Sequence, residues 1–177
     1  MVCVGCAPAR SMAVHVFGNH LVDAEGRAIR LLGVDRSGAE YACIQGLGFF
    51  DGPTDAEAIA AMVAWRINAV RLPLNEDCWL GINGAPARYA GRRYQAAVQA
   101  YVTSLNDAGL YVVLDLHWNA PGGERASGQQ HMADLDHAPA FWSSVAATKP
   151  APAPSVRAVC PFESSSASAR PPALKRA

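Results

Sequence analysis

The side chains with the clearest chemical potential follow an apolar run near the middle of the chain. The phrase YVVLDLHWNAPGG, residues 111–123, carries five apolar residues among its first six and then presents His117, Trp118 and Asn119. A strand holds the residues at its exit rigidly, and such positions often carry binding or catalytic side chains. We therefore expect His117 to face a ligand or a catalytic partner.

Two further groups of polar and aromatic residues follow apolar segments in the same way. One group comes after a segment near residue 31, and the other after a segment near residue 69. Their members are Asp35, Arg36 and Tyr41 in the first group and Asn75, Glu76, Asp77 and Trp79 in the second. If the three segments are parallel strands, their carboxyl ends meet at one edge of a sheet, where α/β proteins place their sites.

The histidines and cysteines form no clear metal or redox motif. His15, His20, His131 and His137 show neither the H-x-H nor the H-E-x-x-H spacing of zinc sites. The C-x-x-C spacing of Cys3–Cys6 has no strand-to-helix context and no second pair. We expect no metal and no cofactor.

Composition indicates a globular chain whose character changes near its end. The 177 residues are 51% hydrophobic and carry no net charge, which gives no reason to invoke nucleic acid or an anionic membrane surface. There is no apolar run long enough to span a membrane, and the apolar start is too short for a signal peptide. Residues 1–148 contain 14 acidic residues against 10 Arg and no Lys, whereas residues 149–177 contain one acidic and five basic residues and half of the 12 prolines. We expect an unstructured leader over 1–13, a folded domain over 14–148 and a disordered Pro/Ala/Ser/Arg-rich tail over 149–177.

The periodicity of apolar residues predicts alternating strands and helices. Residues 14–34 are typical of short strands around a turn, ending in an apolar strand over 29–34. Thr54-Asp55-Ala56-Glu57 matches a capping box with Thr54 as the N-cap of an amphipathic helix. Further segments are a short strand over 68–73 closed by Pro73, a helix over about 94–108, a strand from 111 and a helix over 138–147. Trp65 and Trp142 lie on predicted helices and are expected in the core.

The strand spacing favours an α/β barrel. Strands near 31, 69 and 111 are apolar runs separated by helices, which is the pattern of parallel strands covered by helices. No G-x-G-x-x-G follows the first strand, which disfavours a dinucleotide-binding fold. A complete barrel needs roughly 250 residues. We predict a partial TIM (β/α)8 barrel: the first three βα units, preceded by a short N-terminal β-hairpin.

Five phrases give the chain a family resemblance. They are GNHLVDAEGRAIRLLGVDRSGAEYACIQG, FFDGPTDAEAIAAM, NAVRLPLNEDCWLGING, YVVLDLHWNAPG and SGQQHMADLDHAPAFWSSVA. Residues 16 to about 147 resemble the catalytic domain of glycoside hydrolase family 5, in the form found in bacterial secreted cellulases (endo-β-1,4-glucanases). The resemblance implies a (β/α)8 enzyme that cleaves β-1,4-glucan with retention, using two glutamates about 5 Å apart and no metal. It also implies an extracellular monomer whose partner is a β-glucan polysaccharide or oligosaccharide.

The resemblance assigns roles to several residues. Arg71 matches the family arginine that hydrogen-bonds the nucleophile, and His117 matches a histidine that lines the cleavage subsite. As a hypothesis, flat side chains and an amide at the rim contact the sugar; these are Tyr41, Trp79, Trp118 and Asn119. Cys43 and Cys78 follow adjacent strands on the same rim, which allows a disulfide or two free buried thiols.

The chain departs from the family pattern after FWSSVAAT. The family continues with a fourth strand and an Asn-Glu-Pro phrase that carries the acid/base, whereas KPAPAPSVRAVCPFESSSASARPPALKRA contains neither. We expect a frameshift near Thr148, a fragment without either catalytic glutamate, and no activity. Glu76 is expected to be a loop residue with an ordinary surface carboxylate, and Glu163 has no positioning strand. The alternatives are a non-catalytic glycan-binding remnant and a non-functional pseudogene product.

Overall fold

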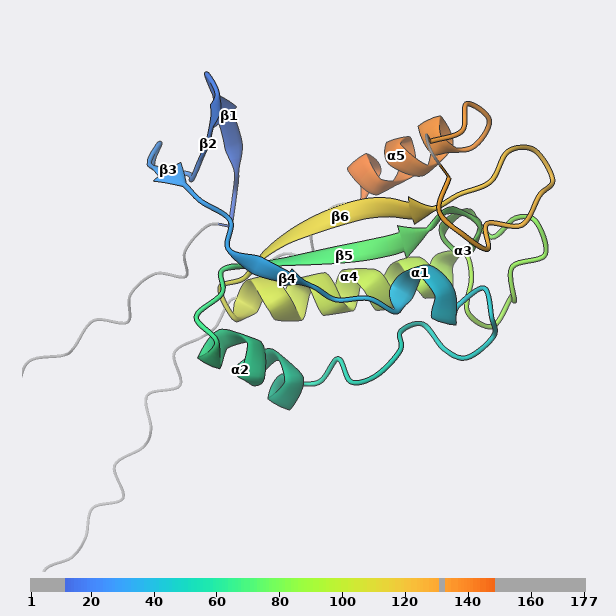
Figure 1. The fold of residues 1–177 in the computed structure, drawn as a ribbon, viewed down its shortest axis with the longest axis horizontal. Helices are drawn as coiled ribbons and strands as arrows, with labels where there is room; N and C mark the ends of the chain where they lie inside the picture. The colour runs from blue at the N-terminus through green and yellow to red at the C-terminus, as the bar shows by residue number, and fades with distance from the viewer. Residues whose placement is uncertain (1–11, 131–132, 149–177) are drawn as a thin grey trace, which may run out of the picture.

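The computed structural model describes residues 12–130 and 133–148 (Figure 1). Most of the expected leader, residues 1–13, and all of the expected tail, residues 149–177, lie outside the described residues. His131, Glu163 and the Cys3–Cys6 pair lie outside them as well.

The centre of the fold is a parallel sheet of three strands in the order β4-β5-β6. The strands are β4 (Gly33–Asp35), β5 (Ala69–Asn75) and β6 (Tyr111–Trp118). Helix α4 (Arg92–Asp107) runs along one face of this sheet, and α2 (Ala56–Ala64) lies beside it near the amino ends of the strands (Figure 1). The short helices α1 (Ala39–Ala42) and α3 (Glu76–Leu80) lie at the carboxyl ends, and α5 (Ala138–Ala147) packs against α3. The fold is therefore α/β.

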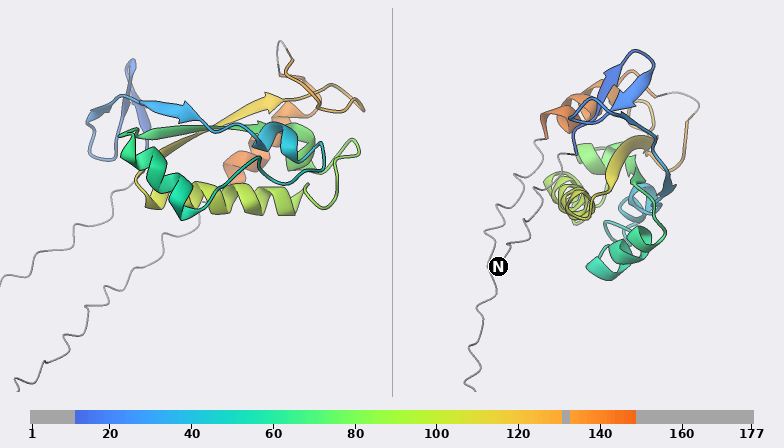
Figure 2. Two further views of the ribbon diagram at one scale, coloured as in Figure 1. Left: turned by 60° about the horizontal axis from the view of Figure 1, so that its bottom comes forward. Right: turned by 90° about the vertical axis from the view of Figure 1, so that its left-hand side faces the viewer.

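A second, antiparallel sheet stands at the amino end of the first (Figure 2). It consists of β1 (His15–Phe17), β2 (His20–Val22) and β3 (Ala28–Ile29) in that order. The turn between β2 and β3 is fixed by Asp23, whose carboxylate accepts the Arg27 N–H at 2.9 Å and the Arg27 Nε at 2.8 Å.

The segment predicted as one strand over 29–34 is divided between the two sheets, so that prediction is wrong. Asn68 provides the physical reason. Its Oδ1 accepts the Leu32 N–H at 2.7 Å, and its Nδ2 donates to the Arg30 carbonyl at 2.8 Å. Because one side chain satisfies these backbone groups, the chain turns from one sheet to the other without a strand partner there.

Strand β5 continues through Pro73, where the sequence predicted that it would end. Backbone groups of alternate residues in a parallel strand point to alternate neighbours, and the Arg71 carbonyl accepts the Arg36 N–H at 2.8 Å on the β4 side. Pro73, two residues later, faces the same side. Since β4 ends at Asp35, the N–H that proline lacks would have met no strand, and the proline removes no ladder bond.

The core lies between the parallel sheet and its helices. Leu72 and Leu74 of β5 are fully buried, and the Trp79 ring meets Tyr94 and Phe141 at centroid distances of 6.3 and 5.6 Å. Edge-to-face contacts of this kind add to the free energy gained by burying the rings.

Trp65 and Trp142 contradict the prediction that they are core residues, because they are 68% and 42% exposed. The buried positions of their segments belong instead to Met62 and to Phe141. None of the described helices combines the length and apolar character needed to cross a bilayer.

Helix α2 begins one residue later than the capping-box pattern predicted. Its N-cap is Asp55, whose side chain accepts the Ala58 N–H at 2.9 Å, so the expectation for Thr54 is wrong. Both Thr54 and Asp55 are good N-cap residue types, and sequence spacing alone does not separate them.

We predict that Asp55→Ala lowers the free energy of unfolding by about 1 kcal/mol, because it removes an acceptor from the first turn of α2. Thr54→Ala is the matched control and should change it by only a few tenths of a kcal/mol. Urea denaturation followed by circular dichroism measures both. A larger loss for Thr54→Ala than for Asp55→Ala would contradict the assignment of the cap.

Candidate functional site

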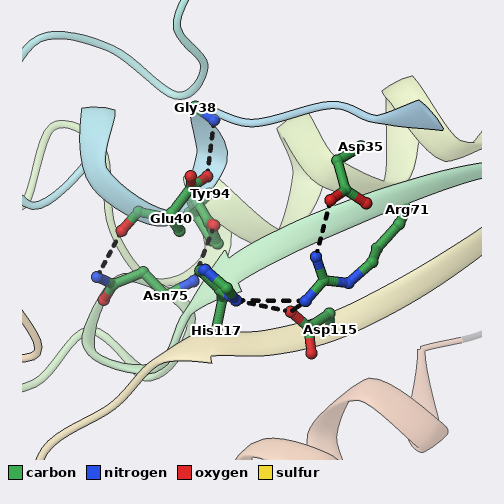
Figure 3. A network of polar contacts seen from close by, with 8 residues as sticks. All are labelled: Asp35, Gly38, Glu40, Arg71, Asn75, Tyr94, Asp115 and His117. Atoms are coloured by element: carbon green, nitrogen blue, oxygen red, sulfur yellow. Dashed lines mark hydrogen bonds and ion pairs between the residues drawn. The ribbon is translucent and has the colours of Figure 1, made fainter. Parts of the chain in front are cut away.

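The three parallel strands bring four polar side chains together toward their carboxyl ends (Figure 3). Asp35 comes from β4, Arg71 from β5, and Asp115 and His117 from β6. The register pairs Asp35 with Arg71 and Arg71 with Val113. Asp115 and His117 lie two and four residues beyond Val113 and therefore share its face of the sheet. We call Asp35, Arg71, Asp115 and His117 the strand-end cluster.

Arg71 joins the strand-end cluster. Its Nη1 lies 3.1 Å from a carboxylate oxygen of Asp35, and its Nη2 lies 2.6 Å from Oδ2 of Asp115. One guanidinium thus links the central strand to both neighbours by charge-assisted hydrogen bonds. Arg71 is 38% exposed and Asp115 28% exposed, so the group is accessible from the uncovered face of the sheet. A shallow hollow on that face is lined by Leu31, Gly33, Val34, Asp35, Ala69, Arg71 and Val113.

Asp115 also fixes the state of His117. Oδ2 of Asp115 lies 3.0 Å from Nδ1 of His117, and a carboxylate oxygen accepts but does not donate. A neutral His117 therefore carries its proton on Nδ1 and presents an unprotonated Nε2. The 3.4 Å approach of Arg71 to the same Nδ1 is then a close contact between two donors rather than a second bond.

Of the strand-end cluster, the sequence identified Arg71 and His117 as site residues but missed Asp115. The signal was present, because an aspartate inside the apolar run VVLDLHW is a buried-strand polar residue on the same face as His117. Asp35 was noted only as a residue following a strand, and its partner was not predicted.

A second network ties the segments that follow the strands to one another (Figure 3). The Asn75 side chain donates to the carbonyls of Glu40 and Ala126, both at 2.8 Å, and accepts the Cys78 N–H at 3.0 Å as the N-cap of α3. Tyr94 reaches from α4 and donates its hydroxyl proton to the Ala39 carbonyl at 2.9 Å. The rim therefore has its buried polar groups paired, which makes it a rigid support.

Cys43 and Cys78 are joined in a disulfide, with their Cα atoms 6.2 Å apart. Cys43 caps α1 and Cys78 lies in α3, and both are fully buried. Of the two arrangements that the sequence allowed, a disulfide or free thiols, the structure has the disulfide. It links the segments that follow β4 and β5.

Two of the four residues expected to contact sugar meet at the rim. The rings of Tyr41 and Trp118 lie with their centroids 6.1 Å apart, and both side chains are partly exposed. The Tyr41 hydroxyl donates to the Asp51 carboxylate, and this bond raises the pKa of the tyrosine. An aromatic pair flanked by a carboxylate can stack on a sugar ring and bind its hydroxyl groups.

The other two residues are buried. Trp79 is 1% exposed, and its Nε1 donates to Ser144 at 3.0 Å, so the expectation that it offers a face to a sugar is wrong. Asn119 is 3% exposed, and its amide donates to Asp134 at 3.2 Å. Asn119 thus binds the chain that follows β6 rather than solvent.

Glu76 contradicts the expectation of an ordinary surface carboxylate in a loop. It begins α3 and is fully buried, and neither of its carboxylate oxygens has a donor in hydrogen-bonding geometry. Burial, together with the neighbouring carboxyl of Asp134, raises the pKa of Glu76 to about 8; the Ala120 N–H offers a weaker favourable contact. Glu76 is therefore neutral at pH 7. Its burial prevents it from reaching a substrate.

Comparison with known proteins identifies relatives of the chain. Residues 22–149 match the family model described as cellulase (glycosyl hydrolase family 5). Endoglucanase CelA of Streptomyces lividans is 30% identical over 147 residues, which cover 81% of this chain and 27% of that protein. The chain thus spans about a quarter of the length of this curated relative.

Two solved structures are also similar. An endogalactoceramidase is 27% identical with a TM-score of 0.49, over 60% of this chain and 23% of that one. The catalytic domain of Thermobifida fusca endoglucanase Cel5A, solved in complex with cellotetraose, is 22% identical with a TM-score of 0.42, over 62% of this chain and 32% of that one.

We predict that Glu76 makes the stability of the fold fall as pH rises. Between pH 4.5, its ordinary pKa, and about 8, the folded chain keeps the Glu76 proton that the unfolded chain has released. The unfolded state then binds fewer protons, so the free energy of unfolding decreases across this window, by at most about 1.4 kcal/mol per pH unit. Glu76→Gln, whose amide is neutral throughout, should remove this decrease.

Urea denaturation at both ends of the pH window tests this effect. Glu57→Gln, at an exposed position on α2, is the matched control and should keep the dependence of the unaltered chain. The assignment fails if Glu76→Gln retains the full decrease.

Proposed function

Because the chain belongs to glycosyl hydrolase family 5, we propose that it forms part of a glycoside hydrolase that cleaves O-glycosyl bonds in β-1,4-glucan with retention. In this proposal residues 14–148 are the first three βα units of a (β/α)8 barrel, preceded by a short N-terminal hairpin. The carboxyl ends of β4, β5 and β6 are then one part of the barrel rim that holds the substrate.

The observation that supports this proposal most is the meeting of Arg71 and His117 on one oxygen of Asp115. These are the two residues to which the family resemblance assigns roles beside the reacting carboxylates. They come from different strands, and their side chains converge on the uncovered face of the sheet. Arg71 supplies fixed positive charge there, and His117 supplies an acceptor nitrogen for a sugar hydroxyl.

Retaining hydrolysis needs an acid/base and a nucleophile about 5 Å apart. Asp35 and Asp115 are both bound to Arg71, and Glu76 is buried away from the strand-end cluster. We therefore propose that no described carboxylate takes either role, and that this chain alone does not turn over substrate. Residues 149–177 hold one acidic residue and no Asn-Glu-Pro phrase. The proposed cause is a frameshift near Thr148, which the nucleotide sequence of the locus tests.

A second candidate function, binding of a glycan without cleavage, is favoured by the Tyr41–Trp118 pair. Two partly exposed rings at the carboxyl ends of the strands, with the Asp51 carboxylate beside them, have the features that bind a sugar. The buried disulfide supports an extracellular location for either function, since disulfides persist in oxidising compartments.

We predict that the purified chain releases no reducing ends from carboxymethylcellulose above the rate of a buffer blank, because the acid/base and nucleophile are missing. Glu76→Gln should behave identically in the same assay. Clear hydrolysis by the unaltered chain that Glu76→Gln abolishes would overturn both the proposed inactivity and the exclusion of Glu76 from the chemistry.

A further inference from the structure

The chain that follows β6 is held in place by a small set of polar contacts. We call its described residues, 119–130 and 133–137, the rim loop. Asp134 is its principal anchor: it accepts the Asn119 amide at 3.2 Å through Oδ2 and the His137 N–H at 2.6 Å through Oδ1. Gly122 closes the loop, since its N–H donates to Asp136 at 2.9 Å and its carbonyl lies 2.7 Å from Nε2 of His137.

The third group at Asp134 is the carboxyl of Glu76. Two ionised carboxylates held together away from water repel each other strongly, and a single shared proton converts the repulsion into a hydrogen bond. The donors around the pair decide which group keeps the proton. Asp134 receives N–H groups from Asn119 and His137, whereas neither oxygen of Glu76 has such a donor. Glu76 therefore carries the proton and donates it to an ionised Asp134.

The surroundings of Glu76 favour its neutral form. On its own helix the neighbouring charge is Asp77, whose carboxylate accepts the Ala126 N–H at 2.8 Å and the Asn83 amide at 3.0 Å. The other elements packed against α3 bring the Tyr94 hydroxyl from α4 and His137 at the start of α5.

The sheet and α1 complete these surroundings. Asn75 of β5 directs its amide to the carbonyl of Glu40, and the Glu40 carboxylate is occupied by the Gly38 N–H at 2.7 Å. On β6, Asp115 and His117 bind each other and Arg71. These groups thus have partners of their own, and the group that Asp134 shares with Glu76 is the proton.

We propose that Glu76 is a positioning residue whose proton, shared with Asp134, fastens the rim loop to α3 and so fixes the end of β6 that carries Trp118. Asn119, next in the chain to Trp118, belongs to the same set of contacts through Asp134. The fastening itself depends only on the described contacts. Its consequence for sugar binding rests on the proposed function.

The rim loop should loosen when the shared proton is lost. Exposed Arg125 lies in the loop and exposed Arg66 follows α2 at the amino end of the sheet, so trypsin reports on both in one digest. We predict that the rate of cleavage after Arg125, divided by the rate after Arg66, rises several-fold across the Glu76 pKa of about 8. In Glu76→Gln the ratio should stay at its low value, because the glutamine N–H donates to Asp134 at every pH.

Infrared spectroscopy of the unaltered chain tests the proton directly and needs no variant to fold. A carboxylic-acid C=O band at neutral pH, lost above the Glu76 pKa and absent from Glu76→Gln, is expected. The absence of this band from the unaltered chain, or a pH-dependent cleavage ratio that Glu76→Gln leaves unchanged, would overturn the proposal. Titration with cellotetraose separates the two ideas: binding without the band refutes the fastening alone, whereas the band without binding refutes the glycan site alone.

Discussion

The interaction on which the rim depends is the bridge that Arg71 makes between the carboxylates of β4 and β6. The backbone ladder sets the spacing and register of the strands, but it does not determine what their uncovered face presents. Arg71 does so by binding Asp35 at 3.1 Å and Asp115 at 2.6 Å, and Asp115 in turn orients His117. Because the pair with Asp115 is only partly exposed, its geometry is worth more than that of a typical surface ion pair.

The opposite face of the same sheet is apolar, and the two faces divide the work of the fold. Leu72 and Leu74 face the helices and are fully buried, while Arg71 between them faces outward. The strict alternation of side chains along a strand makes this division possible. At the carboxyl ends the chain then passes through the disulfide, the Asn75 network and the rim loop, which hold the segments after the strands against α3 and α4.

The sequence predicted the elements better than the contacts between them. Helix α5 occupies the predicted range 138–147, and the alternation of strands and helices follows from the apolar periodicity. The extent of β5 past Pro73 depends on where β4 ends, which no local pattern contains. The burial of Trp79 and Glu76 likewise depends on α5 and the rim loop, which pack over α3 from more than 40 residues away in the chain. Long-range packing overrides local expectations at such positions.

The central claim, that the ends of these strands form a glycan site, is tested most directly by titrating the labelled chain with cellotetraose and following the indole N–H signals by NMR. Trp118 lies at the strand ends beside Tyr41, Trp79 is buried, and Trp65 is exposed at the amino end of the sheet. A glycan site there predicts a saturable shift of the Trp118 signal that exceeds any change at Trp65 or Trp79. No saturable shift at Trp118, or an equal shift at Trp65, would contradict it.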